Sequence, residues 1–224
     1  MKREVLEVDS VQYKVGDINL LTDVYLNCSS GEVVGILGRN GSGKSTLLQI
    51  ILGEKKTYEK NIRINKQTYE EPFKAEKIAY LPQNSFLPIF LKLKKIIKLF
   101  LSSLEAQEAI LKEEIIISNL DKKPDQLSGG ERKLIEILCI MHLDAPFILL
   151  DEPFANLDPL IKDKIVSVLQ KFSKLGKGIV IADHDYRNII KVSDKIMLLK
   201  SGYCREIKDL KELESENYLP FGTI

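Results

Sequence analysis

The chain has 224 residues, of which 44% are hydrophobic and 29% are charged, and its formal net charge is +1. This composition is typical of a soluble globular protein with a substantial core, and the near-zero charge gives no general attraction toward nucleic acid or an anionic membrane. No apolar run approaches the roughly 20 residues that cross a bilayer, and the first residues do not resemble a signal peptide. We therefore expect a cytoplasmic protein with no nucleic-acid partner.

Cys28, Cys139 and Cys204 lie far apart, so neither a disulfide framework nor a zinc site is expected.

The first part of the chain predicts three strands and a helix. Apolar and polar residues alternate over Val5 to Val11 and over Leu20 to Cys28, which indicates two strands. The continuous apolar run from Val33 to Leu37 predicts a strand buried on both faces. A helical pattern follows at Leu47 to Leu52. The nine residues from 38 to 46 therefore connect a buried strand to a helix.

This connection has the pattern G-x-x-x-x-G-K-S/T of a phosphate-binding loop. Its backbone N–H groups can point at an anion, with the positive end of the helix dipole behind them. Glycines at 38, 41 and 43 permit positive φ and close approach, Lys44 reaches the β- and γ-phosphates, and Ser45 offers a hydroxyl to Mg²⁺. A plain glycine-rich turn is the alternative, but the strand before and the helix after favour mononucleotide binding. The predicted nucleotide contacts are Gly38, Arg39, Asn40, Gly41, Ser42, Gly43, Lys44, Ser45 and Thr46.

The middle of the chain predicts two short strands followed by helices. The strands are expected at Asn61 to Ile64 and Lys77 to Leu81. Apolar residues at helical spacing, with lysines between them, predict an amphipathic helix over Leu91 to Leu104, and a second helix is expected over Glu105 to Ile116. Farther on, a serine at 128 and a glutamate three residues later form a capping box, which predicts a helix to about His142.

The second half of the chain alternates strands with helices. The expected strands are Phe147 to Leu150, Ile179 to Ala182 and Lys195 to Leu199, and the expected helices run from Pro159 to about Leu175 and from residue 186 to about Val192. This alternation predicts a mostly parallel sheet, which binds ligands at the carboxyl ends of its strands. Gly38, Asp151 and His184 all follow strand ends, so we expect them to lie at one edge of that sheet.

Four further segments follow the phosphate loop in a fixed order: Gln83, the run LSGGE from Leu127 to Glu131, the strand from Phe147 to Glu152, and His184. With these motifs the chain resembles, over nearly its full length, the ATP-binding subunit of ATP-binding cassette (ABC) transporters. The resemblance implies an α/β fold: a P-loop NTPase core with a mostly parallel sheet, an N-terminal antiparallel β flank and an inserted helical subdomain. It also implies a single domain over residues 1–224, with the core in 1–83 and 128–224, the helical subdomain in about 84–127, and the signature helix 128–143 packing with that subdomain.

The resemblance assigns roles to individual side chains. Asp151 ends the Walker B strand and is expected to hold Mg²⁺ together with Ser45 and Gln83, partly through water. Glu152 corresponds to the catalytic glutamate that acts on the attacking water, and His184 to the switch histidine that binds the γ-phosphate. The catalytic set is therefore Glu152, His184, Gln83 and Lys44, and the implied ligands are ATP and Mg²⁺.

A second cassette is implied by the signature motif. Ser128, Gly129, Gly130 and Glu131 are expected to close over ATP held by a partner chain, in a homodimer or a heterodimer of cassettes. Two glycines at the positive end of a helix expose N–H groups to a γ-phosphate, and the capping box explains why the helix begins there. Asn156 to Asp158 resembles the D-loop, which crosses the same interface.

The function implied is that of an ATP-hydrolysing motor subunit that pairs with a separate transmembrane permease at the cytoplasmic face of the membrane. The alternative is a soluble ABC ATPase that assembles or remodels a cytosolic complex. A nucleotide-regulated binding module with little turnover is a third hypothesis, but Glu152 and His184 are both present.

Three positions depart from the family pattern or leave two interpretations open. The aromatic residue that often stacks on adenine is replaced by Val15, with Tyr13 nearby, and either could contact the base. Cys139 stands where arginine is frequent, which affects either packing or the choice of partner. The stretch from Leu87 to Lys98 is either a docking surface for the membrane subunit or the core of the helical subdomain.

Overall fold

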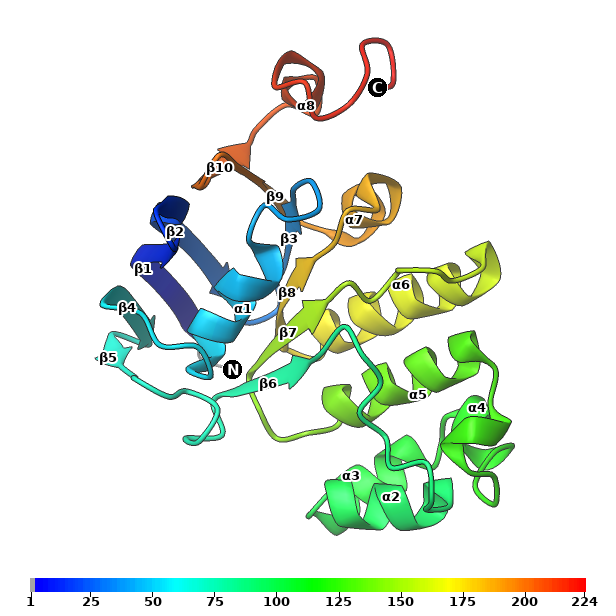
Figure 1. Ribbon diagram of the computed structural model, residues 1–224. Helices are drawn as coiled ribbons and strands as arrows, with labels where there is room; N and C mark the ends of the chain where they lie inside the picture. Colours follow the sequence, from blue (N-terminus) through cyan, green and yellow to red (C-terminus); the bar gives the residue numbers. More distant parts are fainter. Residues whose placement is uncertain (1–2) are drawn as a thin grey trace.

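The computed structural model describes residues 3–224, which form two sheets and a group of helices (Figure 1). The larger sheet has six strands in the order β10-β9-β3-β8-β7-β6, and the smaller has four in the order β2-β1-β4-β5. The larger sheet consists of β3 (Val33–Leu37), β6 (Ile78–Leu81), β7 (Phe147–Asp151), β8 (Gly178–Ala182), β9 (Lys195–Lys200) and β10 (Tyr203–Ile207). The smaller sheet consists of β1 (Val5–Val15), β2 (Ile18–Ser29), β4 (Glu59–Ile64) and β5 (Gln67–Thr68).

The helices alternate with the strands or form an insertion between them. In chain order they are α1 (Lys44–Leu52), α2 (Leu93–Phe100), α3 (Leu104–Ile110), α4 (Glu114–Ile117), the 3₁₀ turn η1 (Pro124–Gln126), α5 (Gly129–Met141), α6 (Pro159–Lys174), α7 (Tyr186–Val192) and α8 (Glu212–Ser215). In the part of the chain that the structure describes, none of these helices has the length and hydropathy of a membrane span.

The sheet topology confirms the predicted P-loop architecture with an antiparallel flank. Strand β3 pairs in parallel with β8 and β9, and β7 pairs in parallel with β6 and β8. Strand β10 joins the edge antiparallel to β9, and β1 pairs antiparallel with both β2 and β4. The register sets Ile36 beside Ala182 and Ala182 beside Asp151. The segments that follow β3, β7 and β8 therefore leave the sheet at the same edge.

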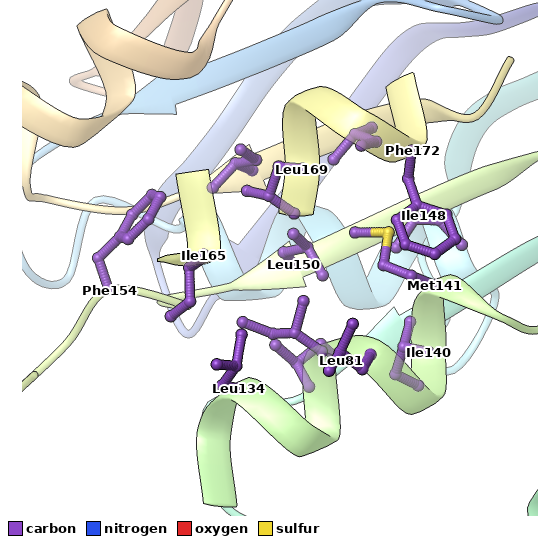
Figure 2. Close-up of a cluster of buried hydrophobic side chains, with 14 of the residues drawn as sticks. Leu81, Leu134, Ile140, Met141, Ile148, Leu150, Phe154, Ile165, Leu169 and Phe172 are labelled. Atoms are coloured by element: carbon purple, nitrogen blue, oxygen red, sulfur yellow. The ribbon is translucent and has the colours of Figure 1, made fainter. Parts of the chain in front are cut away.

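The larger sheet is buried on both faces because alternate residues of each strand enter different cores. On β3, Val34 and Ile36 pack into the core shared with α1 and the smaller sheet, whereas Val33 and Leu37 pack into the core shared with α5, α6 and the insertion. Figure 2 shows side chains of β6 and β7 in this second core meeting those of α5 and α6. Each fully buried aliphatic side chain stabilises the fold by about 1.5–3 kcal/mol, which fixes the strand ends that carry the site.

The insertion differs from the predicted pair of helices. The helix expected over Leu91 to Leu104 ends at Phe100, because Ser103 begins a new helix by accepting a hydrogen bond from the Ala106 N–H at 3.0 Å. The prediction of a single helix over Glu105 to Ile116 is wrong. The structure has α3 and α4 there, separated by an extended Glu113 whose carboxylate pairs with Lys171 of α6 at 2.6 Å. This contact is tertiary, so no local pattern could indicate it.

The apolar stripe of α2 is core. Leu93, Ile96 and Ile97 are buried in the same cluster as α5 and α6, whereas Ile89 and Phe90 in the preceding loop are 59% and 72% exposed. The structure therefore divides the stretch from 87 to 98 into a buried helix face and an exposed apolar loop.

Candidate active site

The phosphate loop joins β3 to α1 with two residues in the left-handed region, Gly41 at φ 79° and Gly43 at φ 100°. A Cβ on Gly38 would lie 2.5 Å from Ser42 Oγ and 2.8 Å from the Leu199 carbonyl oxygen, so only glycine fits there. No side chain caps the N-terminus of α1, and its first turn holds no acidic residue. The first N–H groups of α1 therefore remain available to an anion, as the motif predicted.

Lys44 is 5% exposed, and its ammonium curls back onto the loop. Nζ donates to the Gly38 carbonyl at 2.7 Å and to the Arg39 carbonyl at 3.3 Å. Burial lowers the pKa of Lys44, while the carboxylates of Glu152, Asp183 and Asp151 act in the opposite direction. The carboxylates thus help to keep a buried cation charged beside the loop.

Ser45 and Asp151 lie together, as predicted. Ser45 Oγ donates to Asp151 Oδ1 at 2.9 Å, and the Tyr80 hydroxyl donates to Oδ2 at 3.0 Å. Burial raises the pKa of Asp151, and these two hydrogen bonds oppose the shift. Tyr80 was not predicted, because its place beside Asp151 follows from the pairing of β6 with β7.

The Ser45 hydroxyl and the Asp151 carboxylate are oxygen donors of the kind that Mg²⁺ prefers. Within residues 3–224, no group of three or more His, Cys, Asp or Glu side chains could hold a metal ion by itself. A magnesium site that relies on one carboxylate, one hydroxyl, water and substrate phosphates needs no such group. The donor set therefore fits Mg²⁺ bound together with a nucleotide.

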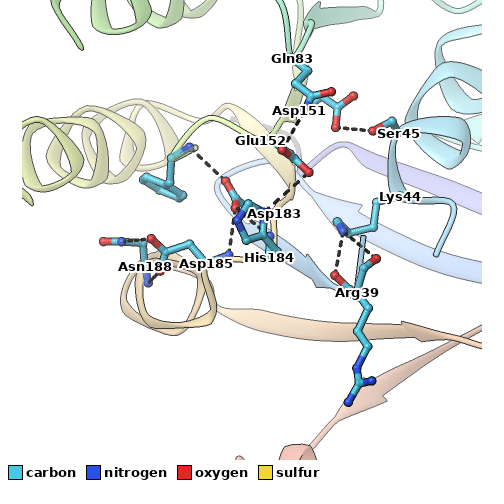
Figure 3. A network of polar contacts seen from close by, with 12 residues as sticks. Arg39, Lys44, Ser45, Gln83, Asp151, Glu152, Asp183, His184, Asp185 and Asn188 are labelled. Atoms are coloured by element: carbon cyan, nitrogen blue, oxygen red, sulfur yellow. Dashed lines mark hydrogen bonds and ion pairs between the residues drawn. The ribbon is translucent and has the colours of Figure 1, made fainter. Parts of the chain in front are cut away.

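Gln83, Glu152 and His184 form a line of contacts at the same sheet edge (Figure 3). Gln83 Nε2 donates to Glu152 Oε2 at 2.9 Å, and His184 Nδ1 lies 3.7 Å from Glu152 Oε1. Glu152 itself has a φ of 48°, and its N–H donates to the Ala182 carbonyl at 2.8 Å. A left-handed glutamate is uncommon, and the bond to β8 holds the carboxylate between the other two side chains.

Asp183 is a buried residue that the sequence interpretation missed. It is fully inaccessible, and its carboxylate accepts the N–H groups of Phe154 at 3.0 Å, His184 at 2.7 Å and Asp185 at 2.9 Å. Burial raises the pKa of Asp183, and the hydrogen bonds from these backbone N–H groups oppose that shift. Asp183 therefore ties the loop after Glu152 to the loop that carries His184. An acidic residue directly after an apolar strand was the available signal.

The phosphate loop, Gln83 and Glu152 line a hollow of about 390 Å³, whereas Asp151 and His184 lie outside its lining. Its lining residues are Leu20, Asn40, Gly41, Ser42, Gly43, Lys44, Ser45, Thr46, Gln83 and Glu152. The four signature residues are not part of this lining. Arg39 points away from the hollow and donates from Nη2 to the Asn217 carbonyl at 2.9 Å.

The signature residues form the predicted capping box at the start of α5. Ser128 Oγ accepts the Glu131 N–H at 3.1 Å, and Glu131 Oε2 accepts the Ser128 N–H at 2.9 Å. The bond from the Ser128 backbone lowers the pKa of Glu131. In the D-loop, Asp158 caps α6 by accepting the Ile161 N–H at 3.0 Å.

The remaining open positions have distinct environments. Lys55 Nζ lies 5.1 Å from the centre of the Tyr13 ring, and Tyr13 packs partly into the core. Val15 is 55% exposed at the end of β1. Cys139 is fully buried, and burial raises its pKa to about 12, which is consistent with a packing role.

The comparison with known proteins agrees with this site. Residues 21–155 match the family model described as ABC transporter. The chain is 32% identical over 197 residues to the lipopolysaccharide export system ATP-binding protein LptB of Escherichia coli K12, covering 82% of each chain. It is 31% identical over 239 residues to a protein of Methanocaldococcus jannaschii named as an ABC transporter ATP-binding protein, covering 94% of this chain and 83% of that one.

Two solved structures are similar as well. One is the ATP-binding subunit of an ABC transporter, with a TM-score of 0.82, 26% identity and coverage of 96% of this chain and 94% of that one. The other is a dimeric ATP-binding cassette in a post-hydrolysis state with ADP and Pi, with a TM-score of 0.76, 29% identity and coverage of 91% and 98%. The chain therefore belongs to the ABC transporter family. Within that family it is an ATP-binding subunit and an ATPase, as predicted.

Proposed function

We propose that this chain is one of two cassettes that bind ATP and Mg²⁺ head to tail, hydrolyse the ATP and drive a separate membrane subunit. The observation that carries the proposal is the contact of both Gln83 and His184 with Glu152, where Gln83 and Glu152 line the hollow beside the phosphate loop. The unit proposed is a single domain over 1–224, with the core in 1–83 and 128–224 and the helical subdomain in about 84–127.

The residues in and beside the hollow have distinct chemical tasks in this proposal. Glu152 accepts a proton from the attacking water or orients it, with Gln83 holding the carboxylate in place. His184 donates a hydrogen bond to the γ-phosphate, and Lys44 moves from its loop carbonyls to the phosphate oxygens. Mg²⁺, held by Ser45 and Asp151 and through water by Gln83, would neutralise charge on the phosphates.

The signature residues complete the site of the second cassette. Ser128, Gly129, Gly130 and Glu131 lie outside the lining of their own hollow and present the N-terminus of α5 to the partner's γ-phosphate. A similar cassette has been solved as a dimer with ADP and Pi. Loss of the shared γ-phosphate would then open the dimer. Val15, exposed at the end of β1, is the proposed apolar contact of the adenine.

The membrane subunit is proposed to meet the exposed loop before α2, at the cytoplasmic face of the membrane. Ile89 and Phe90 supply exposed apolar surface there, and the exposed lysines 92, 94, 95 and 98 follow in the sequence, of which Lys92 and Lys94 pair with Asp121. The relative LptB is named for a lipopolysaccharide export system. Purification of the chain from membranes with a polytopic partner would support this role, and a purely soluble partner would support the cytosolic remodelling alternative instead.

The dimer is tested with Glu152→Gln, which should bind ATP, hydrolyse it slowly and accumulate as a dimer. We expect light scattering with ATP and Mg²⁺ to give twice the monomer mass for this variant. Lys44→Ala is the matched control and should remain monomeric because it does not bind the nucleotide. A Glu152→Gln protein that binds ATP and stays monomeric would overturn the shared-site proposal.

A further inference from the structure

We propose that Lys133 and Glu136 of α5 are positioning residues for ATP hydrolysis, which hold the loop of Gln83 so that its side chain reaches Glu152. The inference rests on the proposed catalytic roles of Gln83 and Glu152. It concerns two side chains that lie outside the hollow and that no motif singled out.

Glu136 is an unusual residue for the middle of a packed helix. Its carboxylate is completely buried, in the stretch of α5 that packs against β6 and α6. A buried carboxylate is costly unless a cation and hydrogen-bond donors compensate it. Its two partners are the hydroxyl of Ser85, which donates to Oε1, and the ammonium of Lys133, which lies 3.5 Å from Oε2.

Lys133 joins this carboxylate to the backbone of the loop after β6. Its side chain is only 13% exposed, and Nζ donates to the Gln83 carbonyl at 3.0 Å and to the Pro82 carbonyl at 3.5 Å. Lys133 and Glu136 are three residues apart, so they lie on one face of α5. That face therefore holds the loop at both ends, through Pro82 and Gln83 on one side and Ser85 on the other.

One of these anchored residues, Gln83, is the one whose side chain touches the carboxylate of Glu152. Gln83 Nε2 reaches Glu152 Oε2 at 2.9 Å, although the Gln83 side chain is otherwise exposed. An exposed side chain gains little from packing, so its placement depends on how firmly the backbone is held. Because α5 begins with the signature motif, the same helix also links the surface that faces the partner's ATP to the position of Gln83.

The test compares kcat and KM for ATP in Lys133→Met and Ser85→Ala. We expect kcat to fall by about tenfold in Lys133→Met, as for loss of a charge-assisted hydrogen bond at a catalytic group, while KM stays within about twofold because the phosphate loop is untouched. Ser85→Ala should also lower kcat with little change in KM, but by a smaller factor. Lys133→Arg should recover most of kcat because it keeps the charge and the hydrogen-bond donors.

Lys177→Met is the matched control for a purely structural effect. Lys177 is also a lysine that donates to two backbone carbonyls, those of Leu143 at 2.5 Å and Ala145 at 2.6 Å, but it does not line the hollow. This variant should lose thermal stability without lowering kcat per folded molecule. Equal loss of kcat in Lys133→Met and Lys177→Met at equal folded fraction would overturn the positioning role.

The double variant Gln83→Ala with Lys133→Met decides whether Lys133 acts through Gln83. We expect it to be no slower than Gln83→Ala alone, since the positioned group is already gone. Losses that add would overturn the inference, and so would an unchanged kcat in both Lys133→Met and Ser85→Ala. If Gln83→Ala itself keeps the wild-type kcat, the proposed role of Gln83 fails, and the inference fails with it for that separate reason.

Discussion

The hydroxyl of Ser45 donates a hydrogen bond of 2.9 Å to Oδ1 of Asp151, across a separation of 106 residues in the sequence. Ser45 lies in the first turn of α1, and Asp151 ends β7. Burial raises the pKa of Asp151. The hydrogen bonds from the Ser45 and Tyr80 hydroxyls and the nearby ammonium of Lys44 oppose this shift and stabilise the charged carboxylate. The side chains of Ser45 and Asp151 are the proposed protein ligands of Mg²⁺.

Asp151→Asn should weaken binding of ATP in the presence of Mg²⁺ by roughly 10- to 100-fold, as is usual for loss of a group that supports a metal. The amide can still accept the Ser45 hydrogen bond but carries no charge. The measurement is ATP affinity with Mg²⁺ and again with a chelator. Affinity in the chelator should be nearly unchanged, and an equal loss in both conditions would contradict the assignment of Asp151 to the metal.

Ser128 has a structural and a functional task that substitution can separate. Ser128→Ala removes the acceptor of the Glu131 N–H and should cost about 1 kcal/mol of unfolding free energy. Ser128→Asp restores a capping acceptor and should recover that stability in urea denaturation. It also places a negative charge where the partner's γ-phosphate is proposed to lie, so ATP-dependent dimerisation should not recover. Recovery of both properties would mean that Ser128 acts only as a cap.

Asp183→Asn should destabilise the protein by about 1–3 kcal/mol. The aspartate accepts three N–H groups, and an amide must turn its NH₂ toward at least one of them. Because two of these donors belong to His184 and Phe154, kcat should fall as well. Denaturation and ATPase assays of the same preparation check both effects. A variant with wild-type stability would show that the carboxylate does not hold these loops together.

His142 predicts a pH dependence of stability. Its ring packs edge-on against Phe172, and burial lowers its pKa below the ordinary 6.5. The unfolded chain therefore binds more protons than the folded one as the pH falls below that value. This contribution to stability is complete above the unfolded pKa and is lost as the pH drops toward the folded pKa.

Thermal unfolding between about pH 7.5 and pH 5.5 checks this prediction. The wild type should lose more stability over that window than His142→Gln, which has no titrating group at this position. Parallel curves for the wild type and His142→Gln would contradict the burial effect.

The local parts of the molecule could be predicted from the sequence because their causes are local. The phosphate loop has Gly41 and Gly43 where the backbone has positive φ, and α5 begins directly after Ser128 because the capping box is contained within four residues. The buried strands were predicted from continuous apolar runs such as Val33–Leu37. The order of the motifs was sufficient to identify the family.

Tertiary structure decided the features that depend on residues far apart in the chain. The sheet order puts β6 beside β7 and β8 beside β3, which brings Tyr80 to Asp151 and places Asp183 between the loops that follow Glu152 and Ala182. The break between α3 and α4 coincides with a contact to α6. A sequence pattern indicates which residues are buried and which cap a helix. A hydrogen bond between distant strands, however, forms only after the register of the whole sheet is fixed.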